Sequence, residues 1–186
     1  MNHMAVGFRY ALPNLRVAPI LFAAFALKVS AAGLCQEYES TVFSCPAGKK
    51  TISVCASKTV TPESGYVQYR FGSKENIELA TPNAKTVANT VIHGYQKQGS
   101  MTGRAALMFT NNDIRYVVWE YDEKPGRGPA AHDDFGAGVK VDISGKRILS
   151  IPCTGLVTPT LLNSTVVDDG ALSWPNSTPI SRYITE

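Results

Sequence analysis

Short runs of alternating apolar and polar residues, separated by turn residues, make up most of the chain after residue 40. In YVQYRFG, Val67, Tyr69 and Phe71 lie on one side of an extended strand. Gln68 and Arg70 then lie on the other side. β-Branched and aromatic residues dominate these runs, and no helical periodicity of useful length appears. The pattern predicts an all-β fold, a single antiparallel β-barrel or closed sandwich of about eight strands. The expected strands are STVFSC (40–45), KKTISVCAS (49–57), YVQYRFG (66–72), NIELA (76–80), RAALMFT (104–110), IRYVVWEYDE (114–123), AGVKVDI (137–143) and KRILSIPC (146–153).

Three short connections between these strands have the residues of tight hairpin turns. Pro46-Ala47-Gly48 separates the first two strands, Asn111-Asn112 joins RAALMFT to IRYVVWEYDE, and Ser144-Gly145 joins the last two. Asn and Gly tolerate the positive φ angles that such turns require. The hairpins therefore predict antiparallel pairing between neighbours in the sequence.

Two connections are too long to be simple turns. Residues 81–103 include VIHGYQKQGSMTG, and a short helical turn at 84–95 is an alternative. Residues 123–136 are EKPGRGPAAHDDFG. Long loops in compact domains are commonly functional or mobile. The stretch after Cys153 is rich in Ser and Thr and broken by prolines, so it either packs on one edge of the fold through Trp174 or trails from it.

The first residues have the pattern of a signal peptide. Arg9 and Arg16 precede an apolar run from Val17 to Leu27, and small residues follow, with cleavage expected after Ala31 or Ala32. The run is shorter than the roughly 20 residues that span a bilayer. Retention of the segment as a short anchor is an alternative, because Lys28 lies close to the cut, whereas Leu34 before Cys35 argues against a lipoprotein. We expect a signal peptide at 1–31, a β-barrel domain at 32–153 and a C-terminal extension at 154–186, in a periplasmic or secreted protein without a stable transmembrane segment.

Removal of the leader also removes the basic excess of the chain. The whole sequence has 18 Lys and Arg against 15 Asp and Glu, and three of the basic residues lie in the leader. The remaining chain has equal numbers of basic and acidic residues. A neutral chain with interspersed signs lacks the basic surface that nucleic acid requires.

All four cysteines follow the leader, and an even number outside the cytoplasm predicts two disulfide bonds. No Cys-x-x-Cys pair is present, and His93 and His132 are far from every cysteine in the sequence. These spacings argue against a zinc site and against a thioredoxin-like redox motif. The spacing alone leaves three connectivities open for Cys35, Cys45, Cys55 and Cys153.

Residues with catalytic chemistry are dispersed along the chain. His93 and His132 are the candidate general bases near neutral pH. His132, Asp133 and Asp134 are adjacent, and offer either calcium ligands or a solvated loop. The aromatic residues of the strands suggest sugar stacking or, alternatively, core packing. Because no titratable groups converge, we expect neither catalytic residues, nor a metal, nor a cofactor, and a binding protein rather than an enzyme. The aromatic set is Tyr69, Tyr116, Trp119 and Tyr121.

Several motifs together resemble the periplasmic and membrane-bound inhibitors of C-type lysozyme, which are small eight-stranded antiparallel barrels. The similar segments are FSCPAGKKTISVC, SMTGR, NDIRYVVW and GVKVDISGKRILSIPC, within residues 41–153. The resemblance implies a bond between Cys45 and Cys153, which leaves Cys35 with Cys55. The opening FSC…GKK…VCAS…YRFG also resembles exported bacterial proteins of unknown function.

The resemblance further implies a contact surface formed by residues 96–104 and 123–136. In the inhibitor family the Ser-x-x-Gly loop and the residues just after the Trp enter the lysozyme cleft and meet its catalytic carboxylates. Where the family has a lysine after the Trp, this chain has Glu120, which would repel those carboxylates. The candidate partner-binding residues are Ser100, Thr102, Gly103, Arg104, Trp119, Lys124 and Arg127.

Four functions are therefore compatible with the sequence. The first is a binding or inhibitor module directed against a lysozyme or another cell-wall hydrolase, and the second is an immunity protein that neutralises a toxin delivered to the periplasm. The third is a saccharide- or cell-wall-acting hydrolase that uses His132, Asp133 and Asp134. The fourth is an envelope protein whose fold has a structural role or binds a small ligand.

Overall fold

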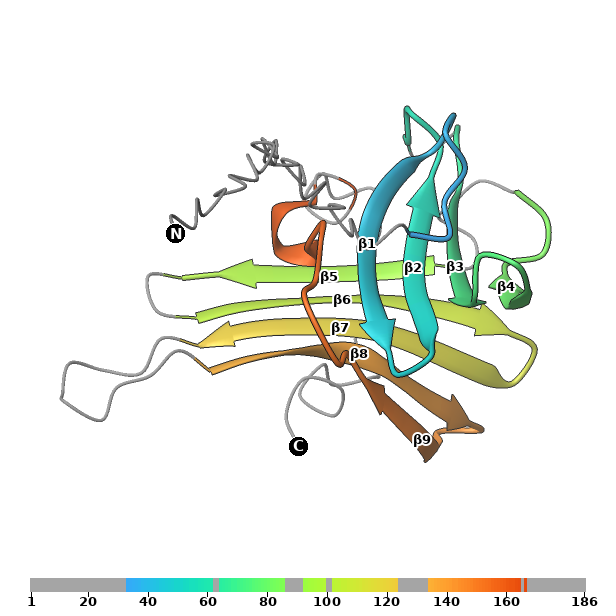
Figure 1. Cartoon of the computed structure of the whole chain (residues 1–186). Coiled ribbons are helices and arrows are strands. Elements are labelled where there is room, and N and C mark those ends of the chain that lie inside the picture. The colour runs from blue at the N-terminus through green and yellow to red at the C-terminus, as the bar shows by residue number, and fades with distance from the viewer. Residues whose placement is uncertain are drawn as a thin grey trace, which may run out of the picture.

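Two antiparallel sheets packed face to face form the body of the protein (Figure 1). The computed structural model describes residues 33–61, 64–85, 92–99, 102–123, 134–164 and 166. One sheet has the strand order β1-β2-β3-β4 and the other β5-β6-β7-β8-β9. The all-β prediction is confirmed, and of the two architectures expected the sandwich fits, because the sheets do not close into a barrel. The strands are β1 (Ser40–Ala47), β2 (Lys50–Ala56), β3 (Val67–Gly72), β4 (Ile77–Thr81), β5 (Ile92–Gln98), β6 (Thr102–Asn111), β7 (Ile114–Glu123), β8 (Asp134–Ile143) and β9 (Lys146–Pro152).

The hairpin turns explain why each strand pairs with its neighbour in the sequence. Ser144 and Gly145 both have positive φ angles, 48° and 82°, as a two-residue hairpin turn between Ile143 and Lys146 requires. Gly48 has a φ of 63° in the turn between β1 and β2. The expected position of that turn was shifted, because Pro46 and Ala47 belong to β1 and the turn is centred on Gly48 and Lys49.

One strand lies where the sequence predicted a long loop. β5 occupies residues 92–98 and pairs with β6 from Ile92 opposite Phe109 to Gln98 opposite Gly103. The prediction was wrong here because β5 is an edge strand with a single neighbour and carries Gly94, Gln96 and Lys97 in place of regular apolar alternation. The alternative of a helical turn is contradicted at residues 92–95.

The core fills the space between the two sheets. Phe43, Val54 and Tyr69 from the four-stranded sheet face Phe109 and Val118 from the other, and all five side chains are buried. The Tyr69 ring lies 5.9 Å from that of Phe109, in a tilted arrangement. The face predicted for Val67, Tyr69 and Phe71 is therefore the core face.

The chain closes one side of the sandwich between β1 and β9. Cys45 of β1 is bonded to Cys153, directly after β9, with a Cα–Cα distance of 5.7 Å. The backbone then runs along the open edge of β1: Thr154 N–H donates to Pro46 O at 2.8 Å and Thr158 N–H to Ser44 O at 2.9 Å. These bonds cover backbone groups that an exposed edge strand leaves unpaired. The second bond joins Cys35 to Cys55, so both bonds follow the pairing that the resemblance implies.

The beginning of the C-terminal extension is part of the sandwich. A short 3-10 helix, η2 (Leu161–Asn163), lies beside β1 and packs on β6 and β7 (Figure 1), and Leu161 and Leu162 are buried in the core with Val157. Trp174, expected to pack the extension, lies outside the described residues, as does the expected signal peptide. No helix within the described part of the chain is long and apolar enough to cross a membrane.

We predict that removal of the Cys45–Cys153 bond destabilises the fold more than removal of the Cys35–Cys55 bond. The first closes a loop of 108 residues and the second a loop of 20. In the chain-entropy model these loops correspond to about 4–5 and about 3 kcal/mol. Urea unfolding of the C45A/C153A and C35A/C55A variants measures both losses. An equal or larger loss for C35A/C55A would contradict this order.

Candidate functional site

The predicted contact residues converge on one end of the five-stranded sheet. β5 and β7 end there, and β6 and β8 begin there (Figure 1). Gly99 N–H donates to Thr102 O at 2.7 Å, so β5 and β6 stay paired as far as residues 99 and 102. Most of the expected surface at 96–104 is therefore strand. Ser100, Lys124 and Arg127 lie outside the described residues.

The remaining candidates lie on two faces of this sheet. Thr102 is opposite Glu123 and Arg104 is opposite Tyr121, on the outer face that also carries Trp119. Gly103 points inward, where an added Cβ would lie 3.1 Å from the side chain of Leu162. The structure thus brings Thr102, Arg104 and Trp119 to one face, whereas Gly103 makes room for η2.

The charge of Arg104 is compensated within the sheet. Its guanidinium forms an ion pair with the Glu123 carboxylate, and both side chains are about one-third exposed. Exposed pairs of this kind stabilise a fold by about 0–1 kcal/mol, so the pair can be exchanged for another partner at low cost.

The four aromatic residues of the predicted set divide between the core and the outer face. Tyr69 and Tyr116 stack in the core with their ring centroids 5.6 Å apart. Trp119 and Tyr121 stack on the outer face with their ring centroids 5.8 Å apart. The Tyr121 ring covers Gly136 of β8, where an added Cβ would lie 2.5 Å from the ring. The core-packing interpretation therefore fits Tyr69 and Tyr116 between the sheets, and also Trp119, which is buried in a second cluster on the outer face.

Trp119 is more enclosed than a stacking platform for a sugar would be. It is 8% exposed and packs with Ala106, Met108 and Val117. The Lys140 ammonium lies 4.8 Å from its ring centroid, a cation–π contact. Tyr121 is only partly buried, and its hydroxyl is 3.3 Å from Asp134 Oδ1. Of the stacked pair on the outer face, Tyr121 is thus the ring that is partly open to solvent.

Glu120 faces the interior, which corrects the expectation that it would repel a partner's carboxylates. It is 1% exposed, and its Oε2 accepts a hydrogen bond from Leu161 N–H at 2.6 Å. Burial raises the pKa of Glu120 to about 7, although hydrogen bonds from the backbone of Leu161 and Leu162 act in the opposite direction. The nearby Asp122 carboxylate raises this pKa further. Glu120 fastens η2 rather than contacting a partner.

The hydrolase hypothesis falls mostly on residues that the structure does not describe. His132 and Asp133 lie outside the described residues, and only the backbone of His93, in β5, is described. Asp134 begins β8 next to Tyr121.

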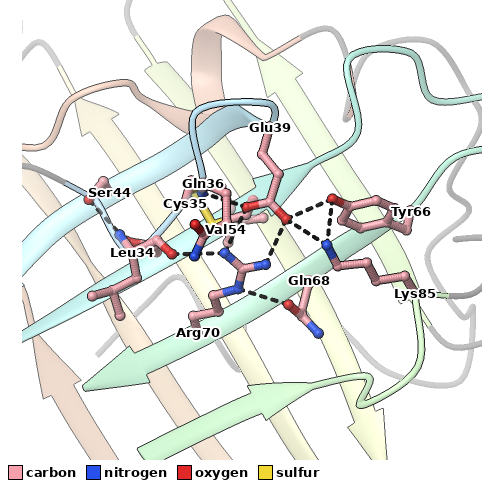
Figure 2. The surroundings of a disulfide bond; sticks show 12 residues. Leu34, Cys35, Gln36, Glu39, Ser44, Val54, Tyr66, Gln68, Arg70 and Lys85 are labelled. Carbon is pink, nitrogen blue, oxygen red and sulfur yellow. Dashed lines mark hydrogen bonds and ion pairs between the residues drawn. A yellow bond between two sulfur atoms is a disulfide. The ribbon is translucent and has the colours of Figure 1, made fainter. Parts of the chain in front are cut away.

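A second cluster of polar side chains lies on the outer face of the four-stranded sheet (Figure 2). Residues 33–39 cover this face and are fastened to β2 by the Cys35–Cys55 bond. Arg70 of β3 makes two bonds of 2.7 Å to Glu39, from Nη1 to Oε2 and from Nη2 to Oε1. Its Nη1 also donates to Leu34 O and its Nε to Gln68 Oε1, both at 2.8 Å. The polar face predicted for β3 is thus buried under the N-terminal segment.

The Glu39 carboxylate is stabilised in its charged form. Burial opposes its ionisation, but hydrogen bonds from Arg70, the Tyr66 hydroxyl and the Gln36 N–H outweigh burial and lower its pKa to about 2. Cys35 and Cys55 lie beside this carboxylate, with ligand atoms within 4.8 Å of one another. The two sulfurs are bonded to each other, which leaves no thiolate for a metal ion.

The sequence pattern missed this buried pair. Arg70 is at a polar position of an alternating strand, and such positions normally face solvent. Glu39 precedes the first predicted strand. The pairing of Cys35 with Cys55 that the resemblance implies was the available signal, because this bond brings the N-terminal segment onto β2.

Comparisons of the chain with protein-family models, with curated proteins and with solved structures found no match.

Replacement of Arg70 by Met should strongly destabilise the fold. It leaves the Glu39 charge buried without its bidentate partner, which typically costs about 3–5 kcal/mol. The double variant E39M/R70M should recover part of this loss, because no unpaired charge remains. Urea unfolding at pH 7 measures both. An R70M variant as stable as the wild type would show that this pair contributes nothing.

The Glu39 ion pair should also make the fold sensitive to acid. The folded-state pKa is lowered, so the stabilisation is present above pH about 4.5 and is lost as the pH falls toward 2. Replacement by Gln should flatten the stability profile in this interval, as measured by urea unfolding at pH 2–5. An unchanged slope in E39Q would contradict the assignment.

Glu120 should produce the opposite pH dependence. Its folded-state pKa is raised from 4.5 to about 7, so ionisation opposes folding and stability falls as the pH rises through this interval. The fall is on the order of 3 kcal/mol and should be absent in E120Q. Urea unfolding at pH 4.5–8 of the wild type, E120Q and the exposed control E37Q measures it. A wild-type slope retained in E120Q would exclude Glu120 as its source.

Proposed function

We propose that this chain is an exported binding module that recognises a secreted or periplasmic protein, such as a lysozyme or another cell-wall hydrolase, through one end of its five-stranded sheet. The observation that carries the proposal is the convergence of Thr102, Arg104 and Tyr121 on the outer face of that sheet. They lie at the end where the β5–β6 and β7–β8 connections begin.

The fold suits a scaffold that holds such a surface in place. Two disulfides and the segment along β1 fasten both sheets. Binding residues are commonly presented at the ends of strands on a rigid framework, where connections can vary without disturbing the core. Disulfides of this kind form in oxidising compartments, in agreement with an exported protein.

The polar side chains at this end favour recognition of a folded protein surface over nucleic acid. Lys97 and Arg104 are balanced by Glu123 and Asp134 on the same face. The exposed pair of Arg104 and Glu123 can open at low cost, so that Arg104 donates to a carboxylate of the partner. The partly exposed ring of Tyr121 adds apolar contact beside it, as aromatic residues and Arg commonly do in interfaces.

Two buried carboxyl groups support binding over catalysis. Glu39 is held by Arg70 and Glu120 by the backbone of η2, so among the described residues these two carboxyl groups, whose pKa values are strongly shifted, serve as structural acceptors. A catalytic acid or base would instead need access to a substrate.

Binding to a panel of secreted cell-wall hydrolases that includes a C-type lysozyme tests the proposal. We expect one of them to form a 1:1 complex by isothermal titration calorimetry. The R104A variant should bind it at least about tenfold more weakly, as expected for loss of a charged contact. Lys49 lies in the β1–β2 turn of the other sheet, so the control K49A should bind like the wild type.

Two outcomes would contradict the proposal. One is the absence of binding across the panel at protein concentrations of tens of micromolar. The other is a complex that R104A and K49A affect equally, because the contact surface would then lie elsewhere on the molecule.

A further inference from the structure

The end of the Lys85 side chain lies beside the Glu39 carboxylate and the Tyr66 hydroxyl (Figure 2). Its Nζ is 3.3 Å from Glu39 Oε1, 3.1 Å from the Tyr66 hydroxyl and 3.2 Å from the Tyr38 hydroxyl. The same nitrogen lies 4.6 Å from the centroid of the Tyr66 ring and 5.0 Å from that of Tyr38. A carboxylate with two aromatic rings is a typical arrangement for binding an organic cation.

The three acceptors match the chemistry of a primary ammonium group. An ammonium has three N–H donors and no acceptor, and three oxygens surround this one. The Tyr66 hydroxyl donates to Glu39 Oε1 at 2.6 Å, which directs its lone pairs toward the cation. A quaternary ammonium could use the rings but could not donate to these oxygens.

The cation enters this cluster from the solvent side. Glu39 is fully buried, whereas the Lys85 side chain is 39% exposed and Tyr38 is 64% exposed. Arg70 binds the carboxylate from the protein side and stays in place when Lys85 leaves. Lys58 donates to the backbone carbonyl of Glu39 and not to the carboxylate, so it does not occupy the cluster.

We propose that Tyr38, Glu39 and Tyr66 form a binding site for a primary alkylammonium group, which Lys85 occupies in the free chain and which the ammonium of another molecule takes when Lys85 moves out. The ligand class is thus a primary amine, such as a lysine side chain or an amino sugar. Lys85 acts as a tethered competitor, with an effective concentration of about millimolar for a short link. The site lies on the other sheet and does not depend on the proposed function.

The test is a titration of the K85A variant with methylammonium, followed by the NMR shift of the Gln36 amide, whose N–H donates to Glu39. We expect saturable binding to K85A with a Kd of about 1–10 mM, and binding at least about threefold weaker to the wild type and to the exposed control K49A. Sodium chloride at equal ionic strength should give no saturable shift. Tetramethylammonium should bind more weakly than methylammonium, and the double variant Y38L/K85A should lose at least about threefold in affinity.

The proposal is overturned if methylammonium binds K85A no more tightly than K49A, or no more tightly than tetramethylammonium does. The Cys35–Cys55 bond holds the N-terminal segment in place in every variant, and the amide spectrum of residues 36–39 reports whether it keeps its fold. If K85A perturbs that spectrum, K85Q is used instead. Its affinity for methylammonium is then compared with that of K49A and with its own affinity for tetramethylammonium, and the same two outcomes overturn the proposal.

Discussion

A covalent bond between the first and the last strand is the constraint on which the rest of this structure depends. Cys45 and Cys153 are 108 residues apart in the sequence, and their bond holds the edges of two separate sheets together. It also sets the path of the next residues, which pair with the open edge of β1 and carry Leu161 and Leu162 into the core. Without this closure the core would be open on one side, and β1 would present unpaired backbone groups to solvent.

Two of the buried carboxyl groups, those of Glu39 and Glu120, show how environment decides the charge of one side-chain type. Glu39 has an arginine, a tyrosine hydroxyl and a backbone N–H as donors, so it stays ionised despite burial. Burial dominates at Glu120, whose donors among the described residues are the backbone N–H groups of Leu161 and Leu162, and its pKa rises to about 7. Both fasten a segment outside the strands, residues 33–39 in one case and η2 in the other. Polar contacts thus add to the disulfide and to the apolar packing that hold these two segments on the sandwich.

Much of the fold could be predicted from the sequence because strand alternation and hairpin turns are local signals. The pattern around Tyr69 places its core face correctly, and the Ser144-Gly145 turn has the positive φ angles expected. The choice between barrel and sandwich is not local, because it depends on whether β4 and β5 pair, and the sequence between them gives no signal for this. β5 was missed because an edge strand needs little apolar alternation.

The candidate site could be predicted only in part. The resemblance selected Thr102, Arg104 and Trp119, which do share a face of the sheet. It did not predict that Gly103 and Glu120 face the interior of the sandwich. The Glu39–Arg70 pair joins residues 31 apart through a covering segment, a contact that no strand pattern encodes.

Disulfide mapping tests the closure of the sandwich most directly. Digestion of the unreduced protein with trypsin and a Glu-specific protease separates all four cysteines, since cleavage after Glu39 divides Cys35 from Cys45 and cleavage after Lys49 divides Cys45 from Cys55. Mass spectrometry should then find the Cys45 peptide linked to the Cys153 peptide, and the Cys35 peptide linked to the Cys55 peptide. A bond between Cys45 and Cys55 would contradict this account, because the first strand would then not be joined to the last.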